Sequence, residues 1–286
     1  MKNFTERIGH LLKASVLDVS VAGTQHGYLH LYATLEDGRR AFAKAAGGGE
    51  DLGAAFAAEA HGLRWLAEAG AVPVPDVLGF DDGMIVLSLL PPGGPTPESA
   101  YRFGADLALL HAAGAETFGA PWPGFIASLP LDNTPGTEWP SWYAERRLVP
   151  YLRRASDADL LSAADVRLVE TVAARLAELA GPAEPPARIH GDCWSGNVLW
   201  PRGRGALIDP AAHGGHRETD LAMLALFGAP HLDRILRGYA GAAPLAGGWR
   251  ARVPLHQLHP LLVHVCLFGA SYAARLRTAA RAALTA

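Results

Sequence analysis

Apolar and polar residues alternate with a two-residue period near the start of the chain, and this pattern predicts strands. Residues 28–35, YLHLYATL, follow the alternation, and RAFAKAA at 40–46 is typical of a returning strand with Lys44 near its middle. The dipeptide Asp37-Gly38 between them suits a tight turn, because glycine adopts positive φ angles without strain. The pattern therefore predicts an antiparallel hairpin.

Helical spacing of apolar residues follows a short glycine run. The segment DLGAAFAAEAHGLRWLAEAG, residues 51–70, has this spacing, with Asp51 suited to the N-cap and Gly70 to the C-terminal end. Glu59 belongs to this predicted helix. A further apolar run, GMIVLSLL at 83–90, is typical of a strand. The first third of the chain is therefore predicted to contain strands and one helix.

A Pro/Gly-rich stretch, PPGGPTP at 91–97, is the best candidate for a linker between two lobes. Beyond it the pattern is mainly helical, apart from short segments around Ile189 and Leu207. We therefore predict an α+β chain whose lobes comprise residues 1–90 and 91–286.

Composition and charge disfavour several classes of protein. Half of the 286 residues are apolar and 19% are charged, as in an ordinary globular protein. A formal net charge of −3 gives no reason to expect nucleic acid as a partner. The apolar run around His264 is too short to span a bilayer, so we expect no membrane partner.

Cysteine content and the N-terminal sequence favour a cytoplasmic location. Cys193 and Cys266 cannot form a disulfide framework, which suits a reducing compartment. The segment MKNFTERIGHLLKASV lacks the apolar core and cleavage site of a signal peptide. A monomer is the expected oligomeric state.

Polar residues of several chemical types gather in IHGDCWSGNVLW, residues 189–200, and in LIDPA shortly after it. Transfer of a phosphoryl group from ATP needs a lysine for the phosphates and a glutamate that positions the lysine. It also needs an aspartate that takes the proton of the attacking hydroxyl, and an asparagine and a second aspartate that hold magnesium. The chain offers this set in order: Lys44, Glu59, Asp192, Asn197 and Asp209. The spacing of Asp192 and Asn197 matches the D-x-x-x-x-N loop of such enzymes.

Each residue of this set has a more ordinary interpretation when taken alone. A lysine on a strand is usually solvated, and a glutamate on a helix is usually a surface charge. His190 is better interpreted as a structural histidine that bonds nearby backbone and holds its turn. His256, His259 and His264 are likewise expected to be core histidines rather than metal ligands. The ordered set is more specific than any of its members.

Beyond these spacings, HGDCWSGNVLW followed by LIDPAAHGGHRETDLAMLALFG resembles the fructosamine kinase (ketosamine kinase) family, within the aminoglycoside-phosphotransferase and protein-kinase-like superfamily. The segments FAKA, FAAEAHGL, LALLHAAGAETFG and FIASLPLDNTPGTEWPSWYAERRLVP resemble the same family, so the resemblance covers nearly the whole chain. It implies a bilobal protein-kinase-like fold. The small N-terminal lobe would hold an antiparallel sheet plus one helix, and the larger C-terminal lobe would be mainly helical.

The resemblance also implies roles for the residues of the predicted ATP and Mg²⁺ site. Asp192 would be the catalytic base, and Asn197 and Asp209 would be the magnesium ligands. Lys44 would contact the phosphates of ATP, and Glu59 would pair with it. A hinge would read adenine through its backbone, formed by Leu87, Ser88, Leu89 and Leu90. Asp220 would brace the catalytic loop from a later helix.

The implied acceptor is a ketosamine, either a small molecule or a glycated lysine of a protein. The residues that would face its sugar and amine are Trp194, His216, Arg217 and Glu218. Glu218 would offset the charge of the amine, and Arg217 would hold Glu218 in place. Core packing of Trp194 and an internal ion pair of Arg217 and Glu218 are the alternatives.

The chain departs from the family pattern at three places. Cys193 stands where leucine is usual, Ser88 where an acidic hinge residue is common, and the nucleotide-covering segment has only Gly23 and Gly27.

Three functions therefore stay open: a ketosamine kinase, a kinase of another small alcohol or amine (an aminoglycoside, choline or a methylthioribose-like sugar), and a nucleotide-binding regulator without catalysis. Retention of the ordered set argues against the regulator. The segment between Asp209 and Asp220 is too short for the peptide-binding segment of a protein kinase.

Overall fold

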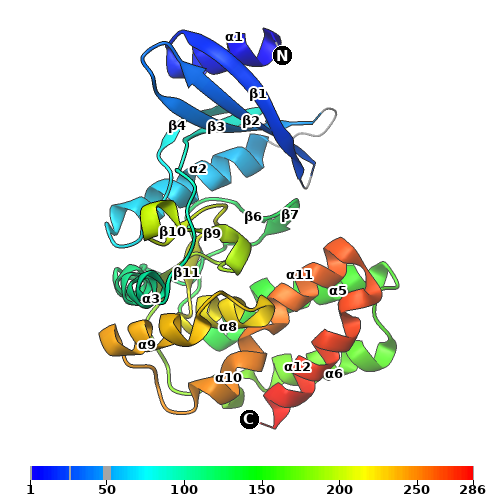
Figure 1. Cartoon of the computed structure of the whole chain (residues 1–286). Coiled ribbons are helices and arrows are strands. Elements are labelled where there is room, and N and C mark those ends of the chain that lie inside the picture. Colours follow the sequence, from blue (N-terminus) through cyan, green and yellow to red (C-terminus); the bar gives the residue numbers. More distant parts are fainter. Residues whose placement is uncertain (1, 26, 48–52, 286) are drawn as a thin grey trace.

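The computed structural model describes residues 2–25, 27–47 and 53–285, and it has two lobes, the smaller one above the larger in Figure 1. The small lobe contains a five-stranded antiparallel sheet in the order β1-β2-β3-β5-β4. Its strands are β1 (Val16–Gln25), β2 (Tyr28–Leu35), β3 (Arg40–Ala46), β4 (Val77–Asp81) and β5 (Met84–Ser88).

The predicted hairpin is confirmed as β2 and β3, with Thr34 opposite Arg40. Gly38 in the turn has a φ of +84°, a conformation that glycine adopts without the strain of a side chain. β3 also pairs with β5, where Lys44 lies opposite Ile85. Because β3 is the central strand, both of its neighbours fix the position of Lys44.

The two faces of the sheet are covered by different helices, because side chains along a strand alternate between faces. Ala43 of β3 belongs to an apolar cluster with Ile8 of α1 (Lys2–Leu12). Phe42 of β3 packs on the other face, in a cluster with Phe56 and Leu63 of α2 (Gly53–Glu68). Lys44 is two residues from Phe42 along the strand and therefore lies on the same face of the sheet, the one that α2 covers.

The prediction of one helix in this lobe is wrong, because α1 is a second. Helix α2 corresponds to the predicted helix, whereas the N-cap predicted at Asp51 lies outside the described residues. Phe4, Ile8 and Leu11 recur at helical spacing, but the segment gains stability only by packing on the sheet. Its Arg7 also donates two hydrogen bonds, of 2.7 and 2.9 Å, to the carboxylate of Asp81 in β4.

The predicted linker has neither helix nor strand over residues 91–96. Helix α3 (Pro97–Ala112) follows, with Thr96 as N-cap and Ser99 completing a capping box. Because the regular structure stops here, we propose that the two lobes divide at residue 90.

The larger lobe is mainly helical, so the predicted bilobal α+β fold class is confirmed. Its other helices are α4 (Trp139–Tyr143), α5 (Val149–Asp157), α6 (Ala163–Ala174), α7 (Leu176–Leu179), α8 (Glu218–Phe227), α9 (Leu232–Ala242), α10 (Trp249–His256), α11 (Leu258–Phe268) and α12 (Ala273–Leu284). Short strands are β6 (Gly124–Ile126), β7 (Leu129–Leu131), β8 (Ala187–Ile189), β9 (Val198–Leu199), β10 (Ala206–Leu207) and β11 (His213–Gly215). Single turns are η1 (Ala144–Leu148), η2 (Ser195–Asn197), η3 (Pro201–Gly203) and η4 (Ala270–Tyr272).

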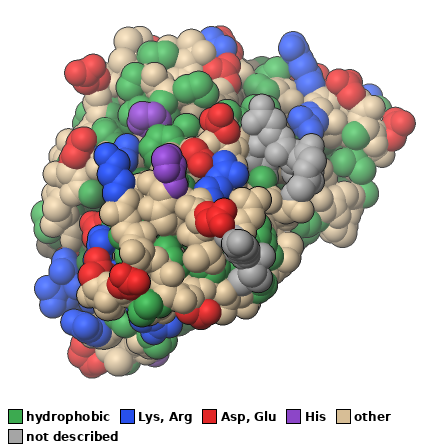
Figure 2. All heavy atoms as spheres, turned by 90° about the horizontal axis from the view of Figure 1, so that it is seen from above, with side chains coloured by type: hydrophobic (Ala, Val, Ile, Leu, Met, Phe, Trp, Pro, Cys, Tyr) green, Lys and Arg blue, Asp and Glu red, His purple; other side chains and the backbone are tan. Residues whose placement is uncertain are grey.

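The surface over the small lobe carries charges of both signs. Figure 2 shows basic and acidic side chains interspersed on this face. Among the helices of the described part of the chain, none combines the length and the apolar character needed to cross a bilayer.

Candidate active site

Lys44 joins the two lobes through its ion pair with Asp209, and Glu59 of its own lobe binds the same amine. Its Nζ lies 2.8 Å from Oε1 of Glu59 on α2 and 2.5 Å from Oδ1 of Asp209, which follows β10. Only 5% of Lys44 is exposed. Burial lowers the pKa of this amine, but the charges of Glu59 and Asp209 outweigh burial and hold the pKa above its usual value. Lys44 is therefore a fixed cation at the boundary of the lobes.

The loop after β8 places Asp192 and Asn197 together. Nδ2 of Asn197 donates hydrogen bonds of 2.9 Å to both the backbone carbonyl and Oδ2 of Asp192. Burial and the charge of Asp209 raise the pKa of Asp192 to about 7, although the bond from Asn197 opposes this shift. A carboxylate with a pKa near neutrality is suited to take up a proton.

His190 and Asp220 hold this loop in shape. The carboxylate of Asp220 on α8 accepts backbone N–H bonds from His190 at 2.8 Å and Gly191 at 3.0 Å, and a bond of 3.1 Å joins it to Nε2 of His111. Nδ1 of His190 accepts the N–H of Asp192, so its Nε2 donates to the carbonyl of Ile208 at 2.9 Å. The positions of His190 and Asp220 are those expected of loop supports.

A two-stranded ribbon carries the two predicted metal ligands. Strand β9 follows Asn197 and strand β10 precedes Asp209, and the strands pair through Val198 and Leu207. The N–H of Ile208 also bonds the carbonyl of Asn197 at 3.1 Å. Asn197 and Asp209 therefore emerge side by side. The Asp209 side chain is 40% exposed and can reach a ligand in the cleft.

Two cavities meet at this group of residues. The larger, of about 720 Å³, is bordered by the predicted hinge residues Leu87, Ser88, Leu89 and Leu90 together with Phe42, Lys44, Ile208 and Asp209. A smaller one, of about 120 Å³ and here called the inner pocket, is bordered by Lys44, Glu59, Asp192, Asn197 and Asp209. The large cavity has the position and size for a nucleotide base and sugar. The inner pocket combines the cation of Lys44 with three carboxylates, a set that would hold phosphates through a bound metal cation.

Trp194 borders the cleft and also packs against the main apolar cluster of the larger lobe. It is half-buried, borders both cavities, and its indole covers Gly196, where a side chain would collide with the ring. One edge-to-face contact, of 6.2 Å between ring centroids, joins Trp194 to Phe227 at the end of α8. The structure therefore brings Trp194 to Asp192.

The structure does not bring His216, Arg217 and Glu218 to the cleft, so their predicted contact with the substrate is not proposed again. Arg217 forms an ion pair of 2.6 Å with Glu184, and the prediction that it holds Glu218 is wrong. Glu218 is 2% exposed and accepts bonds of 2.5 and 2.9 Å from Arg252 of α10. Both residues form internal ion pairs, but with other partners and not with each other as the alternative expected.

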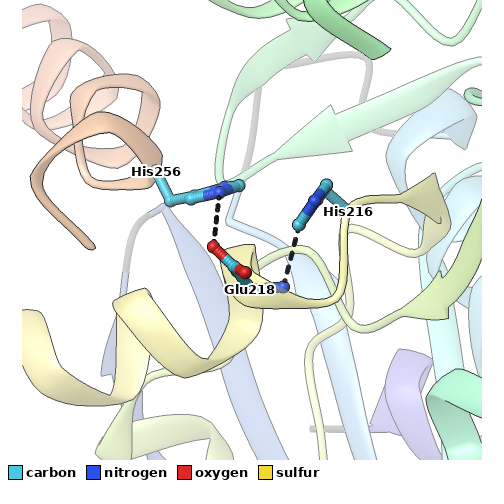
Figure 3. Close-up of side chains that lie close together, drawn as sticks. All are labelled: His216, Glu218 and His256. Atoms are coloured by element: carbon cyan, nitrogen blue, oxygen red, sulfur yellow. Dashed lines mark hydrogen bonds and ion pairs between the residues drawn. The ribbon is translucent and has the colours of Figure 1, made fainter. Parts of the chain in front are cut away.

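Figure 3 shows the polar cluster that His216 and Glu218 form with His256. Nδ1 of His216 accepts the backbone N–H of Glu218, and Nε2 of His256 lies 3.4 Å from the carboxylate of Glu218. Two histidines and a carboxylate could bind a metal ion. Here the guanidinium of Arg252 already bonds both carboxylate oxygens, so the cluster is a buried ion pair with histidine neighbours.

Glu218→Gln is expected to destabilise the fold by about 3–5 kcal/mol, because it leaves the buried charge of Arg252 without its partner. Urea unfolding measures this loss. The matched control is Glu178→Gln, which breaks an exposed pair with Arg175 and should change stability by less than about 1 kcal/mol. A Glu218→Gln protein of normal stability with a selectively raised KM for the acceptor would contradict this structural role and indicate that Glu218 contacts the substrate.

Sequence reasoning gave no role to three residues that shape the site. His111 lies in the last turn of α3 and bonds Asp220. The Leu-His pair at the end of this helix is the sequence feature that could have indicated its role. Arg252 neutralises Glu218 from a distant helix, and no local pattern marks it. Gln25 borders both cavities from the end of β1, a strand that was not predicted.

Comparison with known proteins gives three consistent findings. The profile of the family described as fructosamine kinase matches residues 15–286. A probable ketoamine kinase of Thermus thermophilus is 36% identical over 217 residues, which cover 76% of this chain and 78% of the relative. A crystal structure of a protein from Thermobifida fusca, provisionally named fructosamine-3-kinase, is 53% identical, with a TM-score of 0.96 over 100% of both chains.

More distant structures share the fold alone. A macrolide 2'-phosphotransferase of Brachybacterium faecium has a TM-score of 0.63 at 18% identity and covers 98% of each chain. The bilobal fold is therefore shared with a protein of quite different sequence.

Proposed function

The chain belongs to the fructosamine kinase family, and on that premise we propose that it transfers the terminal phosphoryl group of ATP to a sugar hydroxyl of a ketosamine. One observation carries this proposal: the side chains of Lys44, Glu59, Asp192, Asn197 and Asp209 converge on one pocket from both lobes. A buried cation, a carboxylate with a raised pKa and two oxygen ligands are the parts that phosphoryl transfer requires.

The donor set fits magnesium and a nucleotide. The carboxylate of Asp209 and the amide oxygen of Asn197 are oxygen ligands, which Mg²⁺ prefers, and Asn197 uses its nitrogen rather than this oxygen to bond Asp192. When bound, the ion would neutralise charge on the phosphates. Leu87 to Leu90 border the larger cavity, where their backbone would read adenine.

In the proposed reaction, Asp192 orients the sugar hydroxyl and takes its proton as the oxygen bonds to the terminal phosphorus. The bond from that phosphorus to the bridging oxygen breaks, and ADP leaves with the electron pair. Asn197 holds the carboxylate of Asp192 in place through its amide, and Lys44 offsets the negative charge of the phosphates.

Trp194→Ala is expected to raise the KM for the ketosamine far more than the KM for ATP. The indole lies beside Asp192, where it can stack on the sugar or on the cationic amine. Steady-state kinetics for both substrates, with a melting curve on the same protein, measure this. The control is Trp249→Ala, a half-buried tryptophan on α10 that borders neither cavity. Equal changes in both KM values, or a loss of stability alone, would contradict a contact between Trp194 and the ketosamine.

The competing proposal is a kinase of another small alcohol or amine, such as an aminoglycoside, choline or a methylthioribose-like sugar. A screen of ATP consumption across ketosamines, aminoglycosides and simple amino alcohols separates the two. We expect turnover with ketosamines. Turnover confined to aminoglycosides or amino alcohols would contradict the proposal.

The proposal also covers the location, the oligomeric state and the partners of the protein. We propose a cytoplasmic monomer that acts without nucleic acid or membrane partners. Two free cysteines, Cys193 and Cys266, and the mixed surface charge in Figure 2 support this view.

A further inference from the structure

A third cavity, of about 280 Å³, borders Asp192 and extends over α11 and η4. Four aromatic side chains form its far side and are here called the aromatic wall: Phe227, His264, Phe268 and Tyr272. Within the wall, ring centroids lie 4.8 Å apart for Phe227 and His264, 4.9 Å for His264 and Tyr272, and 5.3 Å for His264 and Phe268. Through Phe227 the wall also touches Trp194, so aromatic surface runs from the catalytic loop to η4.

The cavity is apolar apart from the end that holds Asp192. Met223, Val263 and Leu267 complete its floor, and Asp192 is the only acidic or basic residue other than His264 among the described residues that border it. Nδ1 of His264 donates to the carbonyl of Pro260 at 2.7 Å, which turns its ring into the wall. A group without charge is therefore the natural occupant.

The cavity is continuous with the site of phosphoryl transfer. Gln25, Ala127, Asp192 and Trp194 border both this cavity and the inner pocket. A hydroxyl that reacts at Asp192 must lie at this junction. The polar inner pocket takes the phosphates, which leaves the aromatic wall for the part of the acceptor that does not react.

We propose that the substituent carried by the amine of the ketosamine lies against the aromatic wall, and that uncharged alkyl or aryl substituents are favoured there. This inference rests on the proposed function and names its substrate class. The amine itself, positively charged, would lie near Trp194, whose ring face attracts cations. A carboxylate beside the amine would lose water and find neither lysine nor arginine among the described residues that border this cavity, so it is disfavoured.

Exposure of Phe268 supports the assignment of an apolar ligand. The side chain is 48% exposed at the end of α11, although it belongs to a concave surface beside the catalytic loop. Contact with an apolar group would remove this surface from water and stabilise the complex.

The test compares two acceptors that share one sugar: the deoxyfructosyl derivatives of benzylamine and of glycine. We expect kcat/KM to be higher for the benzylamine derivative by about tenfold or more, as hydrophobic pockets discriminate on this scale. Phe268→Ala should reduce this preference, and Phe268→Arg should shift it toward the glycine derivative by supplying a cation. The control is Tyr101→Ala, an aromatic residue of α3 with 49% exposure outside the cavity, which should keep the wild-type preference.

The outcomes separate this inference from the function on which it rests. Equal kcat/KM for the two acceptors, or a Phe268→Ala protein with the wild-type preference, would overturn the role of the aromatic wall while leaving the kinase assignment intact. Failure of both ketosamines, with turnover of other acceptors, would instead overturn the proposed function.

Discussion

Asp192→Asn is expected to lower kcat by roughly 10²–10⁴ while the affinity for magnesium-ATP stays near that of the wild type. The amide keeps the size of the side chain but cannot take the proton of the hydroxyl. The neighbouring bond from Nδ2 of Asn197 can still be accepted by the amide oxygen, so the loop keeps its shape. Single-turnover kinetics measure the chemical step, and calorimetry measures nucleotide binding.

Ser195→Ala, in the same loop, serves as the control for local disturbance. Ser195 is half-buried and lies outside the residues that border the inner pocket. It should therefore keep turnover within a few-fold of the wild type. An Asp192→Asn protein with unchanged turnover would rule out Asp192 as the base.

Asp209→Asn is expected to abolish measurable turnover and to weaken binding of magnesium-ATP. The substitution removes the proposed charged oxygen ligand of the ion, and it also removes one of the two carboxylates that hold Lys44. Glu59 still holds Lys44, at 2.8 Å, so the amine should stay in place. Calorimetry with ATP in the presence and absence of magnesium separates loss of the metal ligand from loss of the phosphate site.

The control for this experiment is the comparison of ATP binding with and without magnesium. If Asp209 is a ligand, magnesium should improve binding of ATP to the wild type but much less to the variant. Normal binding of magnesium-ATP by the variant would contradict the assignment.

Local patterns in the sequence were sufficient for the parts of the fold where short-range chemistry decides the structure. The hairpin at 28–46 follows from alternation and from Asp37-Gly38, and the ribbon of β9 and β10 follows from two short apolar segments. The spacing from Asp192 to Asn197 places both side chains on one tight loop, so their contact was predictable as well. The direct contact between Lys44 and Asp209 was not predicted, since 165 residues separate them and no local pattern links them.

Features that depend on distant packing could not be predicted in the same way. Helix α1 is stable because it covers a sheet that its own sequence does not reveal. His216, Arg217 and Glu218 lie in one polar segment. Arg217 pairs with Glu184 and Glu218 pairs with Arg252, and these partners from two other segments decide where the side chains lie. The aromatic wall was not predicted for a similar reason: the apolar run around His264 was compared with the length of a bilayer, and His264 was expected in the core, whereas one side of this run faces the cleft.

The central claim is that phosphate from ATP becomes attached to the sugar of a ketosamine. Mass spectrometry of the product, formed from ATP with heavy oxygen in its terminal phosphate, tests this most directly. We predict that the ketosamine gains one labelled phosphoryl group, that fragmentation places it on the sugar, and that Asp192→Asn abolishes the signal. Label found only in free inorganic phosphate, or on the amine substituent, would contradict the account.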